Sequence, residues 1–128
     1  MALTPQQLKS SLARKAQVVE FCESLPEART EPLGERHLVF KVRKKSFAYY
    51  MNDHHGDGRI ALACKSTHAE QQRRIQADPT AYFSPPYLGK DGWIGYRIDG
   101  PRFDMGAVME LIQAAYLAVA PKKLAERI

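Results

Sequence analysis

Cysteine is scarce in this chain of 128 residues, which contains only Cys22 and Cys64. The two lack the Cys-x-x-Cys spacing of redox and metal sites, so we interpret both as reduced, buried packing residues. Long apolar runs are also absent, and the amino terminus has no positively charged start followed by an apolar stretch. These absences predict a soluble cytoplasmic protein that does not interact with a membrane.

The motifs of common enzyme classes are lacking too. The sequence contains no G-x-S-x-G nucleophile motif, no P-loop and no dinucleotide-binding fingerprint. His54 and His55 are adjacent in a turn-forming segment, where neighbouring side chains point apart, so they lack the spacing that aligns two metal ligands. We therefore expect no catalytic activity, no metal and no other cofactor.

A modest excess of basic residues is the main signal in the composition. Nineteen Lys and Arg residues oppose fourteen Asp and Glu residues, which gives a net charge of +5. This charge suits a negatively charged partner such as nucleic acid or an acidic protein, with ordinary solvated surface as the alternative. The length fits a single domain over residues 1–128.

Helix signals open and close the chain. Thr4 and Pro5 supply an N-cap and a first helical residue, and Gln7 completes a capping box for a helix that ends at Leu25-Pro26. Its expected apolar face comprises Leu8, Leu12, Ala16, Val19 and Cys22.

Two further helices are predicted. Thr67 and Glu70 form a second capping box, which opens a short polar helix that stops before Asp78. Asp104 caps a third helix, and Pro121 separates it from a short basic tail, 122–127. The expected apolar set of the third helix is Met105, Val108, Met109, Ile112, Ala115, Tyr116 and Val119.

Between the helices, the period of apolar residues changes to two, as in strands. Strands are predicted at 38–42, 47–51, 60–65 and 93–98, with 26–35 as a polar loop. In the second strand, Phe47, Tyr49 and Met51 are expected to share a face. Strands bracketed by helices predict an α+β fold, in which helices pack on one face of an antiparallel sheet of about four to five strands.

The face of the sheet turned away from the helices is the first candidate site. Strand alternation assigns to it Lys41, Ala61, Ala63, Lys65, Trp93, Gly95 and Arg97. The small residues would leave room for a ligand, while the cations and the indole would supply charge and a stacking plane. The alternative is that this face is simply the wet side of the sheet, with Trp93 partly covered by the preceding loop.

A proline-stiffened aromatic loop precedes Trp93. Pro85 and Pro86 hold the chain extended, and Gly89 and Gly92 supply bends on either side of Lys90. We interpret this loop as a device that presents Tyr87 and Lys90.

Several blocks, in this order, resemble the MmcQ/YjbR family. They are Leu25-Pro26-Glu27, Val39-Phe40-Lys41-Val42, Lys45 with Phe47-Ala48, Leu62-Ala63-Cys64-Lys65, Pro85-Pro86-Tyr87 with Lys90 and Trp93, and Ala115-Tyr116 with Pro121-Lys122. The resemblance implies a CyaY-like (frataxin-like) α+β fold and DNA binding through a double-wing arrangement of β-hairpins. It also implies binding roles for Lys41, Lys45, Lys65, Tyr87, Lys90 and Trp93.

The chain departs from the family pattern in two loops. The segment 88–92 looks shorter and richer in glycine, and the turn 53–58 is extended. The iron-binding acidic surface of frataxin relatives has no obvious counterpart on the first helix, so iron binding does not carry over.

These observations predict a non-enzymatic nucleic-acid-binding protein, with DNA as the expected ligand. The alternative is a module that binds a protein or a small anion through the same surface. The candidate binding residues are Lys41, Arg43, Lys44, Lys45, Lys65, Tyr87, Lys90, Trp93 and Arg97. Phosphate contacts by themselves carry no base specificity.

Overall fold

A computed structural model describes residues 4–53, 56 and 58–128, apart from the side chains of Gln7 and Leu8. The helices are α1 (Pro5–Ser24), α2 (His68–Ala77), the short 3-10 turn η2 (Gly89–Asp91), α3 (Met105–Val119) and α4 (Lys122–Ala125). The strands are β1 (Ala28–Leu33), β2 (His37–Val42), β3 (Lys45–Asn52), β4 (Ile60–Cys64), β5 (Tyr82–Phe83) and β6 (Ile94–Arg97).

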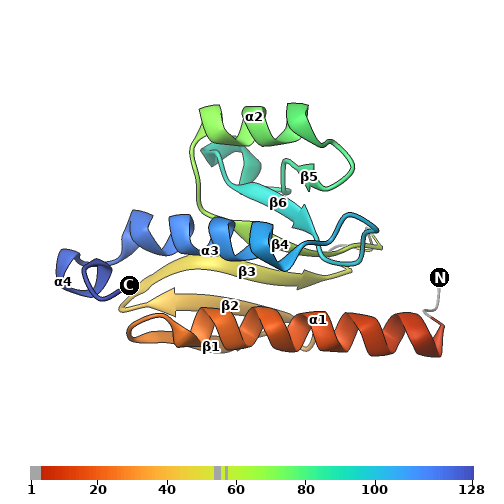
Figure 1. Cartoon of the computed structure of the whole chain (residues 1–128), viewed down its shortest axis with the longest axis horizontal. Helices are drawn as coiled ribbons and strands as arrows, with labels where there is room; N and C mark the ends of the chain where they lie inside the picture. The colour runs from red at the N-terminus through yellow and green to blue at the C-terminus, as the bar shows by residue number, and fades with distance from the viewer. Residues whose placement is uncertain (1–3, 54–55, 57) are drawn as a thin grey trace.

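The strands form one six-stranded sheet in the order β1-β2-β3-β4-β6-β5. All neighbouring strands are antiparallel, and α1 and α3 lie side by side along one face of the sheet (Figure 1). The predicted α+β class is therefore confirmed, and the four predicted strands correspond to β2, β3, β4 and β6. The sheet has two more strands than these, β1 and β5, at its two edges.

Strand β1 lies in the segment that we predicted to be a polar loop, and that prediction is wrong. Its sequence, Ala-Arg-Thr-Glu-Pro-Leu, has no apolar alternation, because the strand pairs with β2 on one side only and stays largely exposed. Pro32 is tolerated here because an edge strand has backbone positions that need no N–H donor. A polar edge strand of this kind lacks the alternation of apolar residues from which strands are predicted.

The predicted starts of α2 and α3 are confirmed by their N-caps. The Thr67 hydroxyl accepts a hydrogen bond from the Glu70 N–H at 3.2 Å, and the Asp104 carboxylate accepts one from the Ala107 N–H at 3.1 Å. Helix α1 begins at Pro5 as predicted, while the Gln7 side chain of its expected capping box lies outside the described part of the chain.

Helix α1 buries only part of the predicted apolar face. Leu12 is 56% exposed and Ala16 is exposed; Leu8 lies outside the described side chains. Cys22 is buried as predicted and Val19 is half-buried against the core, but the other buried residues are Ser11 and Val18, with Leu25 just beyond the helix. Two partly apolar stripes run side by side along this helix, so spacing alone did not decide which one faces the sheet.

A β-bulge in β3 changes which residues share a face. Phe40 pairs with Ala48 but Lys41 pairs with Ser46, so Phe47 is an extra residue in β3. Phe47 and Ala48 are both fully buried, and Tyr50 follows them into the core. The prediction that Phe47 shares a face with Tyr49 and Met51 is therefore wrong, because the bulge reverses the alternation between them.

Candidate nucleic-acid interface

The strand register confirms the predicted membership of the face opposite α1 and α3. In one row, Tyr49 pairs with Ala63, which pairs with Gly95. In the next rows, Ala61 pairs with Arg97, and Lys41 pairs with Ser46. Alternation therefore placed these residues correctly, since the period of a strand is two.

The middle of this face is covered by the chain itself. A Cβ atom on Gly95 would lie 2.6 Å from the Phe83 ring, which shows that the ring rests directly on the glycine backbone. Ala61 and Ala63 are 3% and 2% exposed. Pro85, Pro86 and Leu88 complete the cover, which leaves a cavity of about 20 Å³, close to the size of a single water molecule. The expectation that the small residues leave room for a ligand is therefore wrong.

Trp93 is part of this packing. Its side chain is 7% exposed, and its ring centre lies 5.6 Å from that of Tyr49. The ammonium of Lys65 lies 5.8 Å from the centre of the indole, within cation–π range. Burial favours the interpretation in which Trp93 packs under its own loop, so direct stacking of a ligand on this ring stays a prediction.

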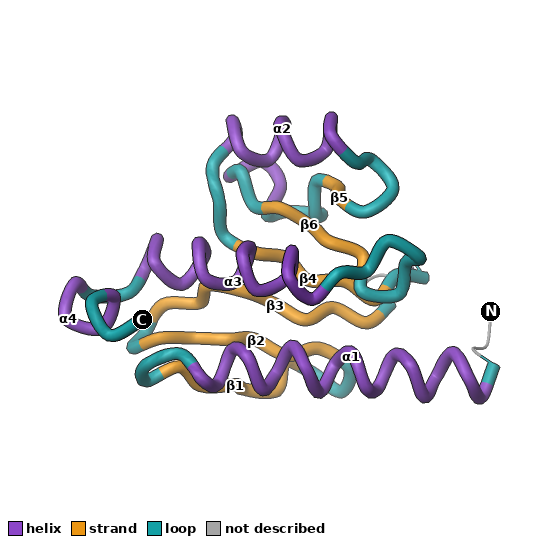
Figure 2. The backbone as a smooth tube through the Cα atoms, in the orientation of Figure 1, coloured by secondary structure: helices purple, strands orange, loops and turns teal. Residues whose placement is uncertain are grey.

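Helix α2 lies beside the loop between β5 and β6 (Figure 2) and is hydrogen-bonded to it. The buried Gln71 amide donates hydrogen bonds to the carbonyls of Gly89 at 2.9 Å and Trp93 at 2.6 Å. A second contact joins the His68 Nε2 atom and the Lys90 carbonyl at 2.6 Å. These hydrogen bonds anchor the loop over residues 84–92 to α2. The loop therefore presents Tyr87 and Lys90 on a backbone that is held in one conformation.

The basic turn 43–45 lies at the opposite end of β3 from Asp53. Lys44 and Lys45 are exposed, while Arg43, with a backbone φ of 56°, donates to the Glu27 carboxylate at 2.7 Å. Helix α4 lies at the same end of the molecule (Figure 1). There, burial raises the pKa of the Tyr116 phenol, and the nearby positive charges of Arg127 and Arg43 partly oppose this rise.

We call the cationic residues at this end the basic end. They are Arg43, Lys44, Lys45, Lys122, Lys123 and Arg127. In the described part of the chain, no carboxylate forms an ion pair with Lys44, Lys45, Lys122 or Lys123. Their charges are therefore available to a ligand.

The other predicted cations are more constrained. Lys41 forms an ion pair with Glu31 at 3.0 Å, and Arg97 forms one with Asp99 at 3.0 Å. Hydrogen bonds from Arg29 and then Lys41 lower the pKa of the Glu31 carboxyl below its usual value. The structure thus separates the candidate residues into the basic end, the covered sheet face and the loop that carries Tyr87 and Lys90.

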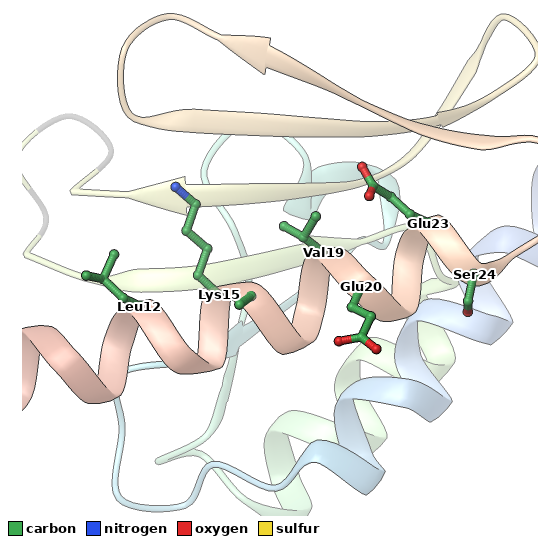
Figure 3. A pocket seen from close by; sticks show the side chains of 7 residues that line it. Leu12, Lys15, Val19, Glu20, Glu23 and Ser24 are labelled. Carbon is green, nitrogen blue, oxygen red and sulfur yellow. The ribbon is translucent and has the colours of Figure 1, made fainter.

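A shallow groove on α1 has a volume of about 670 Å³ and is therefore much larger than the cavity over the sheet (Figure 3). It is lined by Leu12, Lys15, Ala16, Val19, Glu20, Glu23 and Ser24. No predicted binding residue contributes to it. Its charged residues are of both signs, so it offers no concentrated positive charge for an anion.

Comparison with known families decides the relationship. A family model described as YjbR matches residues 23–118. The chain belongs to the YjbR family. This confirms the resemblance that the sequence blocks indicated.

A solved structure supports the fold of this YjbR-family chain. The crystal structure of Deinococcus radiodurans protein DR2400, which carries the domain DUF419, superposes with a TM-score of 0.66 at 24% sequence identity. The match covers 84% of the YjbR-family chain and 82% of DR2400. A comparison with curated proteins found no match.

Two further observations concern sites that the sequence did not favour. Over residues 4–53, 56 and 58–128, no group of three or more His, Cys, Asp or Glu side chains is placed to hold a metal ion. His54 and His55 lie outside these residues. None of the helices that the structure describes has both the length and the apolar character that a bilayer crossing requires.

Sequence reasoning missed the C-terminal part of the basic end in this YjbR-family chain. No binding role is predicted from the sequence for Lys122 and Lys123, because a pair of charges on an exposed helix is usually solvated surface. The position of α4 at the same end of the molecule as the turn 43–45 depends on where α3 ends against the sheet. The Tyr116 hydroxyl, which donates to the Pro26 carbonyl at 2.7 Å, fixes that position through a contact between residues 90 apart in the sequence.

Proposed function

We propose that this YjbR-family protein binds nucleic acid, and DNA in particular, through the basic end. The observation that carries the proposal is the convergence of two segments, the β2–β3 turn and α4, whose exposed lysines have no ion-pair partners among the described residues. Both segments protrude from the sheet, so a phosphate backbone can approach them without displacing any part of the fold.

The electrostatics support a backbone contact in particular. The net charge of +5 favours an anionic partner, and lysine ammonium groups on flexible stems act as point charges toward phosphates. Such contacts position a protein on nucleic acid without reading its sequence. The proposal is therefore one of weak binding with little base preference.

The sheet face contributes less to this function than the basic end. Lys41 and Arg97 are neutralised by Glu31 and Asp99, and Trp93 is buried. Lys65 and Lys90 remain as secondary phosphate contacts in the proposal.

The proposal includes no catalytic step. Burial raises the pKa of the Cys64 thiol to about 12, and burial likewise raises the pKa of the Cys22 thiol. Because the thiolate is the nucleophilic form of cysteine, neither side chain is activated for covalent chemistry at neutral pH. This supports a binding protein rather than a cysteine-dependent enzyme.

The alternative function is binding of a small anion or an acidic protein. One arrangement favours it: the Ser46 and Tyr49 hydroxyls lie 3.2 Å apart on the same face as Lys41 and Lys65. Two hydroxyls on a face that also carries the Lys65 ammonium can bind a phosphate or carboxylate, which would compete with Glu31 for Lys41. This alternative uses the sheet face and does not need the basic end.

Salt dependence of affinity distinguishes the two functions. Fluorescence anisotropy with a labelled duplex, repeated over a range of salt concentrations, gives the slope of log affinity against log salt. Lys44→Ala with Lys45→Ala should make this slope shallower by about 2, since each phosphate contact contributes about 0.9. The control, Lys9→Ala with Arg36→Ala, removes the same charge from other exposed positions and should leave the slope nearly unchanged.

An equal effect of the two double variants would mean that net charge, rather than the basic end, governs binding. Absence of detectable binding at low salt would reject the proposal and favour the small-anion or acidic-protein alternative.

A further inference from the structure

Tyr87 is the most exposed large apolar side chain at the surface of the described structure, with 71% of its area accessible. It occupies the tip of the loop over residues 84–92, which is otherwise engaged in covering the sheet. Most of the area of this aromatic side chain is therefore accessible to a ligand.

The backbone at Tyr87 has an uncommon conformation. Its φ is 66°, and the Leu88 N–H donates to the Pro86 carbonyl at 2.7 Å, which makes Tyr87 the central residue of a γ-turn with positive φ. For a bulky side chain this geometry is strained, and it persists only where the surroundings impose it.

The surroundings do impose it. The Gly89 N–H donates to the Pro85 carbonyl at 2.7 Å, and Pro85 is buried against the sheet. The next turn is fixed by Gln71, which holds the carbonyls of Gly89 and Trp93. The Tyr87 ring is thus attached to a preorganised backbone, so a ligand that binds it meets little of the entropy cost of ordering a loop.

We infer that Tyr87 is a base-stacking residue and that the nucleic acid bound by this protein is one with unpaired bases. The inference rests on the proposed function. The loop offers an aromatic plane at Tyr87 and an exposed ammonium at Lys90. A nucleotide presents an aromatic plane and a negative charge together, which matches this pair.

Unpaired bases fit the loop better than a duplex does. In a duplex, the faces of the bases are covered by their neighbours, whereas a single strand exposes them to aromatic side chains. The rigid γ-turn keeps the largely exposed ring at the surface, where an unstacked base can reach it without the opening of a nucleic-acid duplex. Stacking is tolerant of base identity, so it adds affinity for single strands without sequence preference.

The test compares a labelled oligothymidine of twelve nucleotides with a twelve-base-pair duplex, by fluorescence anisotropy on the full chain. Tyr87→Gly removes the ring and keeps a residue that adopts positive φ readily. It should weaken oligothymidine binding about 5- to 150-fold, which is the range for the loss of one stacked base, and change duplex binding less than about twofold. Tyr87→Phe, which keeps the plane, should bind the oligothymidine within about twofold of the wild-type protein.

Two controls separate this effect from damage to the fold. Leu117→Ala truncates another exposed apolar side chain, on α3, and should alter neither affinity. The melting temperature of Tyr87→Gly should change little, because relief of backbone strain opposes the added entropy of the unfolded chain.

Equal losses on single strand and duplex would overturn the inference, and so would unchanged oligothymidine binding by Tyr87→Gly. In the second case, the proposed function would still be supported if Lys44→Ala with Lys45→Ala makes the slope of log affinity against log salt shallower. If the wild-type protein binds neither probe at low salt, the proposed function and this inference fall together.

Discussion

Replacement of Trp93 by alanine separates the packing role of this residue from a binding role. The indole is 7% exposed and contacts the Tyr49 ring and the Lys65 ammonium. We expect Trp93→Ala to lower the free energy of unfolding by about 3–5 kcal/mol, the usual range for removing a buried aromatic side chain.

The magnitude follows from the structure. A tryptophan buries about 150–250 Å², which at about 25 cal/mol per Å² corresponds to about 4–6 kcal/mol as an upper bound. The aromatic contact with Tyr49 adds about 0.5–1.5 kcal/mol. Partial collapse of the loop over residues 84–92 into the vacated space would reduce the total.

Urea unfolding followed by far-UV circular dichroism measures this loss without relying on the tryptophan that the variant lacks. Nucleic-acid affinity is then measured without urea and corrected for the folded fraction. Trp93→Phe serves as the matched variant and should lose less stability, because a ring remains in the site. A stability loss below about 1 kcal/mol, together with a clear fall in affinity, would refute the packing role and support direct stacking on the indole.

Two further predictions concern α2. Gln71→Met removes both amide donors to the buried carbonyls of Gly89 and Trp93 and should cost about 2–4 kcal/mol in urea unfolding, whereas exposed Gln76→Met should cost less than about 0.5 kcal/mol. Equal costs would mean that Gln71 does not anchor the loop. Hydrogen bonds from Arg73 and then Arg74 lower the pKa of Glu70 to about 2, so the stability gained from these contacts is present above the unfolded-state pKa and is lost as the pH falls through about 2. Glu70→Gln should therefore cost about 0.5–1 kcal/mol at pH 7, a small value because the side chain is solvent-accessible, and the difference from wild type should disappear near pH 2 in unfolding curves; a constant difference would contradict it.

The sequence was informative where local rules decide the structure. Thr67 and Asp104 cap their helices as predicted, because an N-cap depends only on residues within one turn. Strand alternation also placed Lys41, Ala63 and Gly95 on one face. These features need no knowledge of the rest of the chain.

Features that depend on distant contacts could not be predicted. A proline-rich aromatic loop has the same composition whether it presents its side chains or covers a sheet, and only the fit of Phe83 onto Gly95 distinguishes the two. The bulge at Phe47 carries no glycine or proline to mark it. The apolar stripe of α1 and the position of α4 likewise depend on how the helices pack.

The central claim is that the basic end is the nucleic-acid-binding surface. NMR titration of the isotope-labelled protein with a short DNA maps the contact residue by residue. The account predicts that the largest chemical-shift changes occur at the amides of 43–45 and 122–127, with a second group at 87–90 when the DNA is single-stranded. Shifts confined to the groove on α1, or to the strands of the sheet face without either loop, would contradict it.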